Sequence, residues 1–294
     1  MSSEELTAIK ELFADSPTSD QVPLEELRGQ YDKLGSLLPP PDDVDIEAIT
    51  IDHIPAEWIN PHNKSNDKVL MYVHGGGYCI GSLDSHRSMV CELAKAAQCQ
   101  VLNVEYRLAP EHAYPAAVED AAQCYQWLLD QGHKHSDIAI GGDSAGGGLT
   151  MATLLEIKKR NLPQAAAGIC LSPWADLTLA SESMVSKANE DPIVSKQGLQ
   201  KMADDYLQGQ DAKADQASSI FADLSGLPPI LIHVGTAEVL LDDSKNLLKA
   251  LESAGVKTTY KEWPDMLHVF QFFHIMLSEA RESIKEIGEF IQEL

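Results

Sequence analysis

Short apolar runs and amphipathic stretches alternate along most of the chain. Residues Val44–Ile54 alternate apolar and polar positions, the pattern of a half-buried edge strand. The apolar runs that predict buried strands are Val69–Val73, Val101–Val104, Ile138–Ile140, Gly168–Leu171, Ile230–Val234 and Thr258–Trp263. The amphipathic stretches that predict helices are Ser85–Ala97, Tyr114–Leu129, Gly147–Lys159, Asp242–Ala254 and Val269–Leu294. Such alternation predicts an α/β fold with a mostly parallel sheet and helices on both faces.

The last amphipathic stretch is the longest. Its apolar residues recur three, four or seven positions apart on one helix face, namely Phe270, Phe273, Leu277, Ile284, Ile287 and Ile291. This spacing predicts one continuous C-terminal helix that includes His274.

Two segments depart from the alternation. Residues Met1–Pro41 are amphipathic and acidic and end in three prolines, which predicts one or two peripheral helices and a stiff linker. Residues Ser181–Phe221 contain no predicted strand but a helix near Ser195–Leu207, as is usual for a lid or cap. The expected organisation is an N-terminal helical segment (residues 1–41), a core (42–180), a cap insertion (181–221) and the rest of the core (222–294).

The charge of the chain excludes several classes of partner. Its 294 residues include 22 Lys and Arg against 45 Asp and Glu, a formal net charge of −23. Phosphate backbones and anionic membrane surfaces repel such a chain, so we expect neither nucleic acid nor a membrane as a partner. The hydrophobic content of 44% is ordinary for a globular protein, and the length suffices for one large α/β domain.

The N-terminus and the cysteines predict the compartment. Residues Met1–Asp15 carry acids where a signal peptide carries positive charge, and no apolar run approaches the length of a membrane span. The five cysteines form no C-x-x-C pair, and their odd number does not suggest a disulfide framework. We therefore expect a cytoplasmic protein with reduced thiols and no membrane insertion.

The strand expected at Ile138–Ile140 leads directly into a glycine-flanked serine and then a helix. Residues 141–146 read Gly-Gly-Asp-Ser-Ala-Gly, and this context is typical of a nucleophile elbow. A Cβ at Gly142 or Gly146 would clash with neighbouring backbone in so tight a turn. A phosphate-binding turn is the alternative, but the sequence lacks a P-loop Lys and a G-x-G-x-x-G after a strand. We therefore predict Ser144 as a nucleophile at a helix N-terminus.

A second glycine-rich loop follows the strand expected at Val69–Val73. It reads His74-Gly-Gly-Gly77, and successive glycines allow backbone N–H groups to point into a cleft. Acyl transfer needs such donors for the oxygen that becomes negative in the tetrahedral intermediate, together with the N–H of the residue after the nucleophile. Gly76, Gly77 and Ala145 are therefore the oxyanion-hole candidates, and His74 is expected to hold the loop without a catalytic role.

Three motifs follow one another at the spacing that they have in a known family of enzymes. They are His74-Gly-Gly-Gly77, Tyr106-Arg-Leu-Ala-Pro-Glu-His112 and Gly142-Asp-Ser-Ala-Gly146. From about Val69 to the C-terminus the chain resembles the bacterial hormone-sensitive-lipase-like carboxylesterases, also called family IV lipolytic enzymes, and the aspartate before the serine resembles their Gly-Asp-Ser-Ala-Gly subgroup.

The resemblance implies fold, activity and assembly. It implies an α/β-hydrolase fold with an eight-stranded sheet, an N-terminal helical cap and hydrolysis of short-chain esters. It also implies that Arg107, Glu111 and His112 brace the loops beneath the elbow. A homodimer through the C-terminal strand and helix is a further expectation.

The chain order of the fold, nucleophile then acid then histidine, restricts the base to three histidines after Ser144. His233 lies inside a predicted apolar strand, and His274 lies in the predicted C-terminal helix. His268 follows the strand Thr258–Trp263 across a short loop, where a base at the catalytic edge should emerge, and it resembles the family's catalytic histidine.

The acid has two candidates. Glu238 falls at the position of the family's acid, where most relatives carry aspartate, and glutamate can also hold the imidazole tautomer and stabilise the imidazolium. Asp242 resembles a family aspartate near the start of the next helix, where a carboxylate is a common N-terminal cap. We predict a Ser144–Glu238–His268 triad, with Asp242 as the alternative acid.

The predicted function is hydrolysis of short- to medium-chain carboxylic esters through an acyl-enzyme intermediate. The expected partner is a small-molecule ester, and no metal or organic cofactor is expected. A lactonase, deacetylase or amidase with the same triad is an alternative, because the nucleophile does not distinguish these acyl groups. A binding protein on the same fold is a remote alternative, since some plant hormone receptors of this fold lack the histidine. Tyr78, Asp191, Trp174 and Phe270 are either pocket or core residues.

Overall fold

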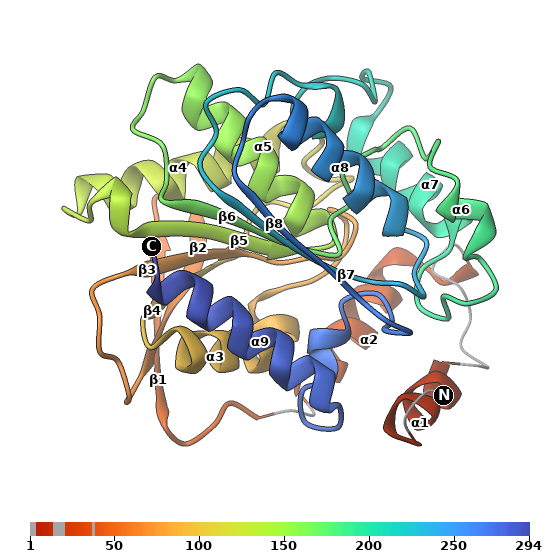
Figure 1. Cartoon of the computed structure of the whole chain (residues 1–294), viewed down its shortest axis with the longest axis horizontal. Helices are drawn as coiled ribbons and strands as arrows, with labels where there is room; N and C mark the ends of the chain where they lie inside the picture. The colour runs from red at the N-terminus through yellow and green to blue at the C-terminus, as the bar shows by residue number, and fades with distance from the viewer. Residues whose placement is uncertain (1–3, 14–20, 37–38) are drawn as a thin grey trace.

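An eight-stranded sheet is the centre of the computed structural model, which describes residues 4–13, 21–36 and 39–294 (Figure 1). The strand order is β1-β2-β4-β3-β5-β6-β7-β8. The strands are β1 (Val44–Ile51), β2 (Ile54–Pro61), β3 (Val69–Val73), β4 (Gln100–Val104), β5 (Ile138–Asp143), β6 (Ala167–Leu171), β7 (Ile230–Gly235) and β8 (Thr258–Trp263). Only β1 with β2 and β2 with β4 pair antiparallel, so the expected α/β fold with a mostly parallel sheet is confirmed.

Helices cover both faces of the sheet. They are α1 (Glu4–Phe13), α2 (Leu24–Ser36), α3 (Leu83–Ala97), α4 (Ala116–Asp130), α5 (Ala145–Lys159), α6 (Ser183–Ser186), α7 (Lys196–Leu207), α8 (Leu241–Ser253) and α9 (Ser278–Gln292). In Figure 1, α4, α5 and α8 lie on one face and α3 and α9 on the other. None of the helices in the described ranges is long and apolar enough to cross a bilayer.

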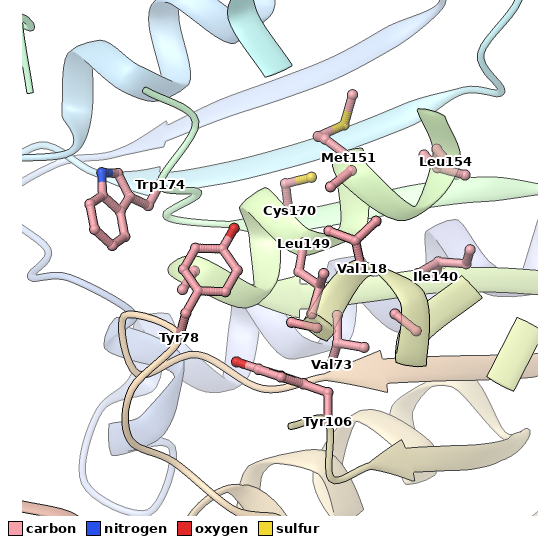
Figure 2. Packing of buried hydrophobic residues seen from close by; sticks show 14 of the residues in the cluster. Val73, Tyr78, Tyr106, Val118, Ile140, Leu149, Met151, Leu154, Cys170 and Trp174 are labelled. Atoms are coloured by element: carbon pink, nitrogen blue, oxygen red, sulfur yellow. The ribbon is translucent and has the colours of Figure 1, made fainter. Parts of the chain in front are cut away.

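The strand pattern explains why both faces are apolar. All five residues of β3 are buried, and alternate side chains of a strand point to opposite faces. Met71 and Val73 therefore join the core beneath α4 and α5, whereas Leu70 and Tyr72 pack with α3 and α9. Figure 2 shows Val73 with residues of α4 and α5 in the first of these cores. The five cysteines are free and buried in these layers.

The antiparallel edge of the sheet differs from the sequence prediction. The strand expected at Val44–Ile54 ends at Ile51, because the chain reverses at Asp52, where φ is +53°, and a second strand, β2, follows from Ile54 to Pro61. The second strand, β2, was missed because it contains Pro55 and Pro61, residues that argue against a strand in a sequence. Both prolines lie near the ends of β2, where their lack of an N–H is tolerated.

The C-terminal helix also differs, because the prediction of one helix over Val269–Leu294 is wrong. Val269 has φ of +45° and precedes a short 3-10 turn at Phe270–Phe273, and α9 begins only at Ser278. His274 therefore lies between the turn and α9. The apolar spacing continues across the break because both parts are buried against different neighbours. Residues Phe270 and Leu277 pack with α1, whereas the apolar side chains of α9 pack with α3.

The insertion and the N-terminal helices lie near the carboxyl end of β3. Tyr206 of α7 stacks on Tyr78, which follows β3, with ring centroids 3.9 Å apart. Arg28 of α2 donates to the carbonyl oxygen of Cys79 at 2.8 Å. The division into a helical segment 1–41, core 42–180, insertion 181–221 and core 222–294 stays a prediction. Residues 1–3, 14–20 and 37–38 lie outside the described part of the chain.

A buried carboxylate fastens the start of the insertion to α8. Asp243 is fully buried and accepts hydrogen bonds from the backbone N–H groups of Ala175 and Asp176 and from the hydroxyl of Ser181. Burial raises the pKa of Asp243 and is the largest effect. The hydrogen bond from Ser181 lowers this pKa, and the charge of the nearby Asp176 carboxylate raises it. Together they raise the pKa of Asp243 to about 7.

Compared with an Asp243→Asn variant, we expect the wild-type protein to lose free energy of unfolding as the pH rises from about 4 to about 8. The folded chain keeps a proton on Asp243 that the unfolded chain, with an ordinary pKa of 3.8, has already lost in this range. The difference between the two proteins should therefore change by up to ~4 kcal/mol. Urea unfolding of both proteins across this range measures it. A difference that is constant with pH would contradict the role of Asp243.

Candidate active site

Ser144 occupies the sharp turn between β5 and α5. Its φ and ψ are 53° and −120°, and the strand before it and the helix after it are both buried. Its N–H donates to the carbonyl oxygen of Leu171 at 2.8 Å, and its own carbonyl oxygen accepts from Gly148 and Trp174. This strained turn leaves Ser144 8% exposed at the N-terminus of α5, where unpaired N–H groups favour negative charge.

The two flanking glycines are required by close backbone contacts. A Cβ on Gly142 would lie 2.5 Å from the carbonyl oxygen of Gly146, and a Cβ on Gly146 would lie 2.6 Å from that of His74. Real side chains do not approach backbone oxygens this closely. The structure therefore confirms that the turn at Ser144 needs glycine on both sides.

The second glycine loop lies beside this turn. Gly76 and Gly77 have φ of +109° and +59°, and the carbonyl oxygen of Gly76 accepts hydrogen bonds from Cys79 and Ile80. Within the described residues, the N–H groups of Gly76, Gly77 and Ala145 have no hydrogen-bond partner. The geometry leaves these three donors available to a substrate oxygen.

His74 holds the loop, as predicted. Its ring is fully buried, stacks on Tyr106 with centroids 4.3 Å apart, and lies 2.8 Å from the carbonyl oxygen of Gly75 through Nδ1. Burial, with the neighbouring ring of His86 adding to it, lowers the pKa of His74 to about 3. A neutral, enclosed imidazole of this kind supports the backbone and is not exposed to substrate.

Asp143 links the serine turn to the glycine loop. Its Oδ1 accepts hydrogen bonds from the hydroxyl of Tyr72 at 2.6 Å and from the N–H of Gly75 at 3.2 Å. Its Oδ2 lies 3.4 Å from Nε2 of His86, whose Nδ1 lies 2.8 Å from the hydroxyl of Ser85. His86 could not be recognised in the sequence, because it lies within the amphipathic helix α3 and belongs to no motif.

His268 and Glu238 meet at the same edge of the sheet. Because β5, β6, β7 and β8 are parallel, the loops after them emerge together. Nδ1 of His268 lies 3.4 Å from Oε1 of Glu238, and both side chains are buried. Burial disfavours the imidazolium, but the hydrogen bond and charge of Glu238, and then the charges of Asp191 and Asp143, outweigh it and raise the pKa of His268.

The structure places Asp242 elsewhere. It is the second residue of α8, and its Oδ2 accepts a hydrogen bond from the N–H of Ser183 at 2.9 Å. Its other oxygen lies 3.9 Å from Nζ of Lys245. Of the two candidate carboxylates, Glu238 is the one in contact with His268, whereas Asp242 fastens the insertion to α8.

The other two downstream histidines have structural contacts. His233 is buried on β7, and its Nδ1 lies 2.9 Å from the hydroxyl of Ser283. His274 is mostly buried, and its Nε2 lies 3.4 Å from the hydroxyl of Ser88. Within the described part of the chain, neither imidazole is hydrogen-bonded to Ser144, Glu238 or His268.

The structure shows the surroundings of the four residues that were predicted to be either pocket or core residues. Tyr78, Trp174 and Phe270 are almost completely buried and belong to the cores. Figure 2 shows Tyr78 and Trp174 close together beside the N-terminal part of α5. Asp191 is buried in the insertion, and its Oδ2 accepts a hydrogen bond from the N–H of Val239 at 2.9 Å, next to Glu238. In the described ranges, no cluster of three or more His, Cys, Asp or Glu side chains has the arrangement of a metal site.

A family model described as an alpha/beta hydrolase fold matches residues 70–272. The structure of an esterase from the bacterial hormone-sensitive lipase family is 42% identical, with a TM-score of 0.96 over 100% of this chain and 99% of that chain. The chain belongs to the α/β-hydrolase family, in its hormone-sensitive-lipase-like branch.

Other members of this α/β-hydrolase family agree on the enzyme class. An acetyl-hydrolase of Streptomyces hygroscopicus is 39% identical over 99% of this chain and 97% of that protein. An esterase of Acinetobacter venetianus is 38% identical over 91% and 88%. The structure of EstE5 soaked with p-nitrophenyl butyrate is 44% identical, with a TM-score of 0.96 and 99% of both chains covered. This hydrolase is a carboxylic ester hydrolase.

Proposed function

We propose that the chain is a serine esterase for short- to medium-chain carboxylic esters, with Ser144 as nucleophile, His268 as base and Glu238 as acid. One observation carries the proposal. A serine in a tight strand-to-helix turn, a histidine in contact with a buried carboxylate, and three N–H groups without a hydrogen-bond partner in the described part of the chain all lie at one edge of the parallel sheet. This combination has the roles that acyl transfer requires.

The proposed reaction proceeds in two halves. His268 takes the hydroxyl proton of Ser144 as Oγ attacks the ester carbonyl carbon, and the same proton then passes to the departing alcohol. The acyl group remains on Oγ as an ester. Water, deprotonated by His268, attacks the acyl carbonyl carbon of this acyl-enzyme. The bond from this carbon to Oγ breaks, the carboxylic acid leaves, and His268 returns the proton to Oγ, which restores the hydroxyl of Ser144.

Glu238 supports the base. A carboxylate that faces Nδ1 keeps the proton there, so that Nε2 is free to accept, and stabilises the imidazolium formed in each half-reaction. The raised pKa of His268 agrees with this role, since it reflects a preference for the charged ring. The reaction needs a neutral ring to start, so activity should be lost as the pH falls through the pKa of His268.

The oxyanion is proposed to bind Gly76, Gly77 and Ala145. Three backbone donors held by a loop and a helix N-terminus need no rearrangement when the carbonyl oxygen becomes negative. Their fixed position follows from the contacts of Asp143 with the loop and of Ser144 with β6.

A preference for short acyl chains is supported by the packing above this loop. A Cβ on Gly77 would collide with Sδ of Met202 on α7, so this methionine lies directly over the glycine loop. Tyr78 and Tyr206 are stacked face to face beside it and are almost completely buried. We infer that α7, from the predicted cap insertion, restricts the acyl site. The homodimer and the cytoplasmic location expected from the sequence stay predictions.

A series of p-nitrophenyl esters from acetate to palmitate tests this function. We expect kcat/KM to be highest for acetate or butyrate and to fall by at least about tenfold at palmitate, because a long chain meets the residues over the loop. A simple lactone and an acetylated sugar are assayed in parallel. A large preference for the lactone or the sugar would replace the esterase by a lactonase or a deacetylase with the same nucleophile.

A further inference from the structure

Ser172 lies between the three loops that carry the proposed triad. It follows β6 directly and is completely buried, and its N–H donates to the carbonyl oxygen of His233 on β7 at 2.7 Å. The residue before it, Leu171, accepts the hydrogen bond from the N–H of Ser144. Its backbone is therefore joined to the serine turn on one side and to the strand before Glu238 on the other.

The hydroxyl of Ser172 joins the remaining two loops. Its Oγ donates to Oε2 of Glu238 at 2.8 Å and accepts from the N–H of Val269, the residue after His268, at 3.1 Å. The second donor to Oε2 is the N–H of Gly235 at 3.2 Å. With Oε2 held by two donors, Oε1 is the oxygen that faces His268.

We propose that Ser172 is a positioning residue of the esterase reaction: its hydroxyl holds the Glu238 carboxylate in the orientation in which Oε1 faces His268. Ser172 has this role only if Glu238 is the acid of the triad, as proposed above. Glutamate has one more rotatable side-chain bond than aspartate, so a carboxylate at its end needs an additional contact to keep one orientation. A buried carboxylate also requires donors, and a hydrogen bond to a charged group is stronger than one between neutral groups.

The backbone at Ser172 supports a role for the hydroxyl. Its φ is +46°, in the left-handed region that favours glycine, and non-glycine residues there are often found at functional sites. Glycine would relieve this strain but would remove both hydrogen bonds of the hydroxyl. A serine kept in this conformation is what a positioning hydroxyl requires.

The test uses two variants that remove the hydroxyl in different ways. Ser172→Ala keeps the Cβ, whereas Ser172→Gly also relieves the backbone, so a folding defect from strain cannot affect both. We expect kcat on p-nitrophenyl butyrate to fall about 10- to 100-fold in each, the range for loss of a hydrogen bond to a charged group, with KM unchanged. Ser219→Ala is the matched control, because Ser219 is also buried and its hydroxyl has no hydrogen-bond partner within the described residues.

The pH profile separates positioning from a general structural effect. The charged groups that act on His268 are Glu238 after β7, Asp191 in the insertion and Asp143 at the end of β5. Of these three carboxylates, Glu238 is the one that is hydrogen-bonded to Ser172. A carboxylate free to rotate stabilises the imidazolium less, so the acid limb of kcat/KM should move to lower pH in both variants.

The same substitutions in a Glu238→Gln background complete the test. If Ser172 acts through Glu238, adding Ser172→Ala to Glu238→Gln should change kcat by less than about twofold. An equal loss in both backgrounds, or an unchanged kcat and acid limb in both single variants, would overturn the role of Ser172 while the esterase mechanism stands. Full activity of Glu238→Gln itself would overturn both the proposed acid and the role of Ser172.

Discussion

Replacement of Ser144 by alanine is expected to abolish ester hydrolysis, lowering kcat on p-nitrophenyl butyrate by about 10⁵- to 10⁶-fold. Without Oγ no acyl-enzyme can form, and the residual rate comes only from the oxyanion donors and substrate binding. The fold should be unaffected, because alanine keeps the Cβ and the backbone hydrogen bonds of residue 144 to Leu171, Gly148 and Trp174. Steady-state kinetics and a thermal melt of both proteins measure these two effects.

Covalent labelling gives an independent readout of the same residue. A serine-directed sulfonyl fluoride should add one label to the wild-type chain, located at Ser144 by mass spectrometry, and none to Ser144→Ala. Ser219→Ala removes a hydroxyl from another buried serine and should keep both activity and labelling. Turnover by Ser144→Ala within tenfold of wild type would end the proposal that this serine is the nucleophile.

Replacement of Glu238 by glutamine is expected to have the second largest effect, a fall in kcat of about 10³- to 10⁴-fold. Glutamine is nearly the same size, but its neutral amide no longer stabilises the imidazolium or fixes the tautomer of His268. Because the carboxylate raises the pKa of His268, its loss should also move the acid limb of the pH profile to lower pH. Activity profiles between about pH 4 and 9 measure both effects.

Asp242→Asn is the matched control for this experiment. It removes a carboxylate four residues away whose partners are Ser183 and Lys245, so kcat and the acid limb should stay within about twofold of wild type. The reverse result, an inactive Asp242→Asn and an active Glu238→Gln, would move the acid to Asp242 and leave the esterase function in place.

Part of the site could be predicted from the sequence because it depends on short-range geometry. The turn at Ser144 and the loop before Tyr78 need glycine at fixed distances from a strand end, and these glycines can be recognised in the sequence. His268 could be identified in the same way, since chain order and strand position leave few alternatives. The parallel strands in the middle of the sheet could also be predicted, because strands buried on both faces, such as β3, are continuous apolar runs.

Other features depend on residues that are distant in the sequence. Whether Glu238 or Asp242 faces His268 is decided by the exit of the chain from β7, and the contacts of Ser172 and His86 join segments far apart along the chain. The break before α9 was hidden for a related reason. Its apolar spacing continues although the two parts pack against different elements.

The sequence by itself determined the α/β order of most elements, the glycine-flanked turn at Ser144, the glycine loop and the candidate base, because each follows from local backbone sterics or from periodic burial. The tertiary structure decided which carboxylate meets the histidine, how Asp143 and Ser172 tie the loops together, and where the last helix begins. These depend on side chains from separate strands meeting at one edge of the sheet. No local pattern encodes such a meeting, since the distance between two loops is set by strand order and register, not by their own residues.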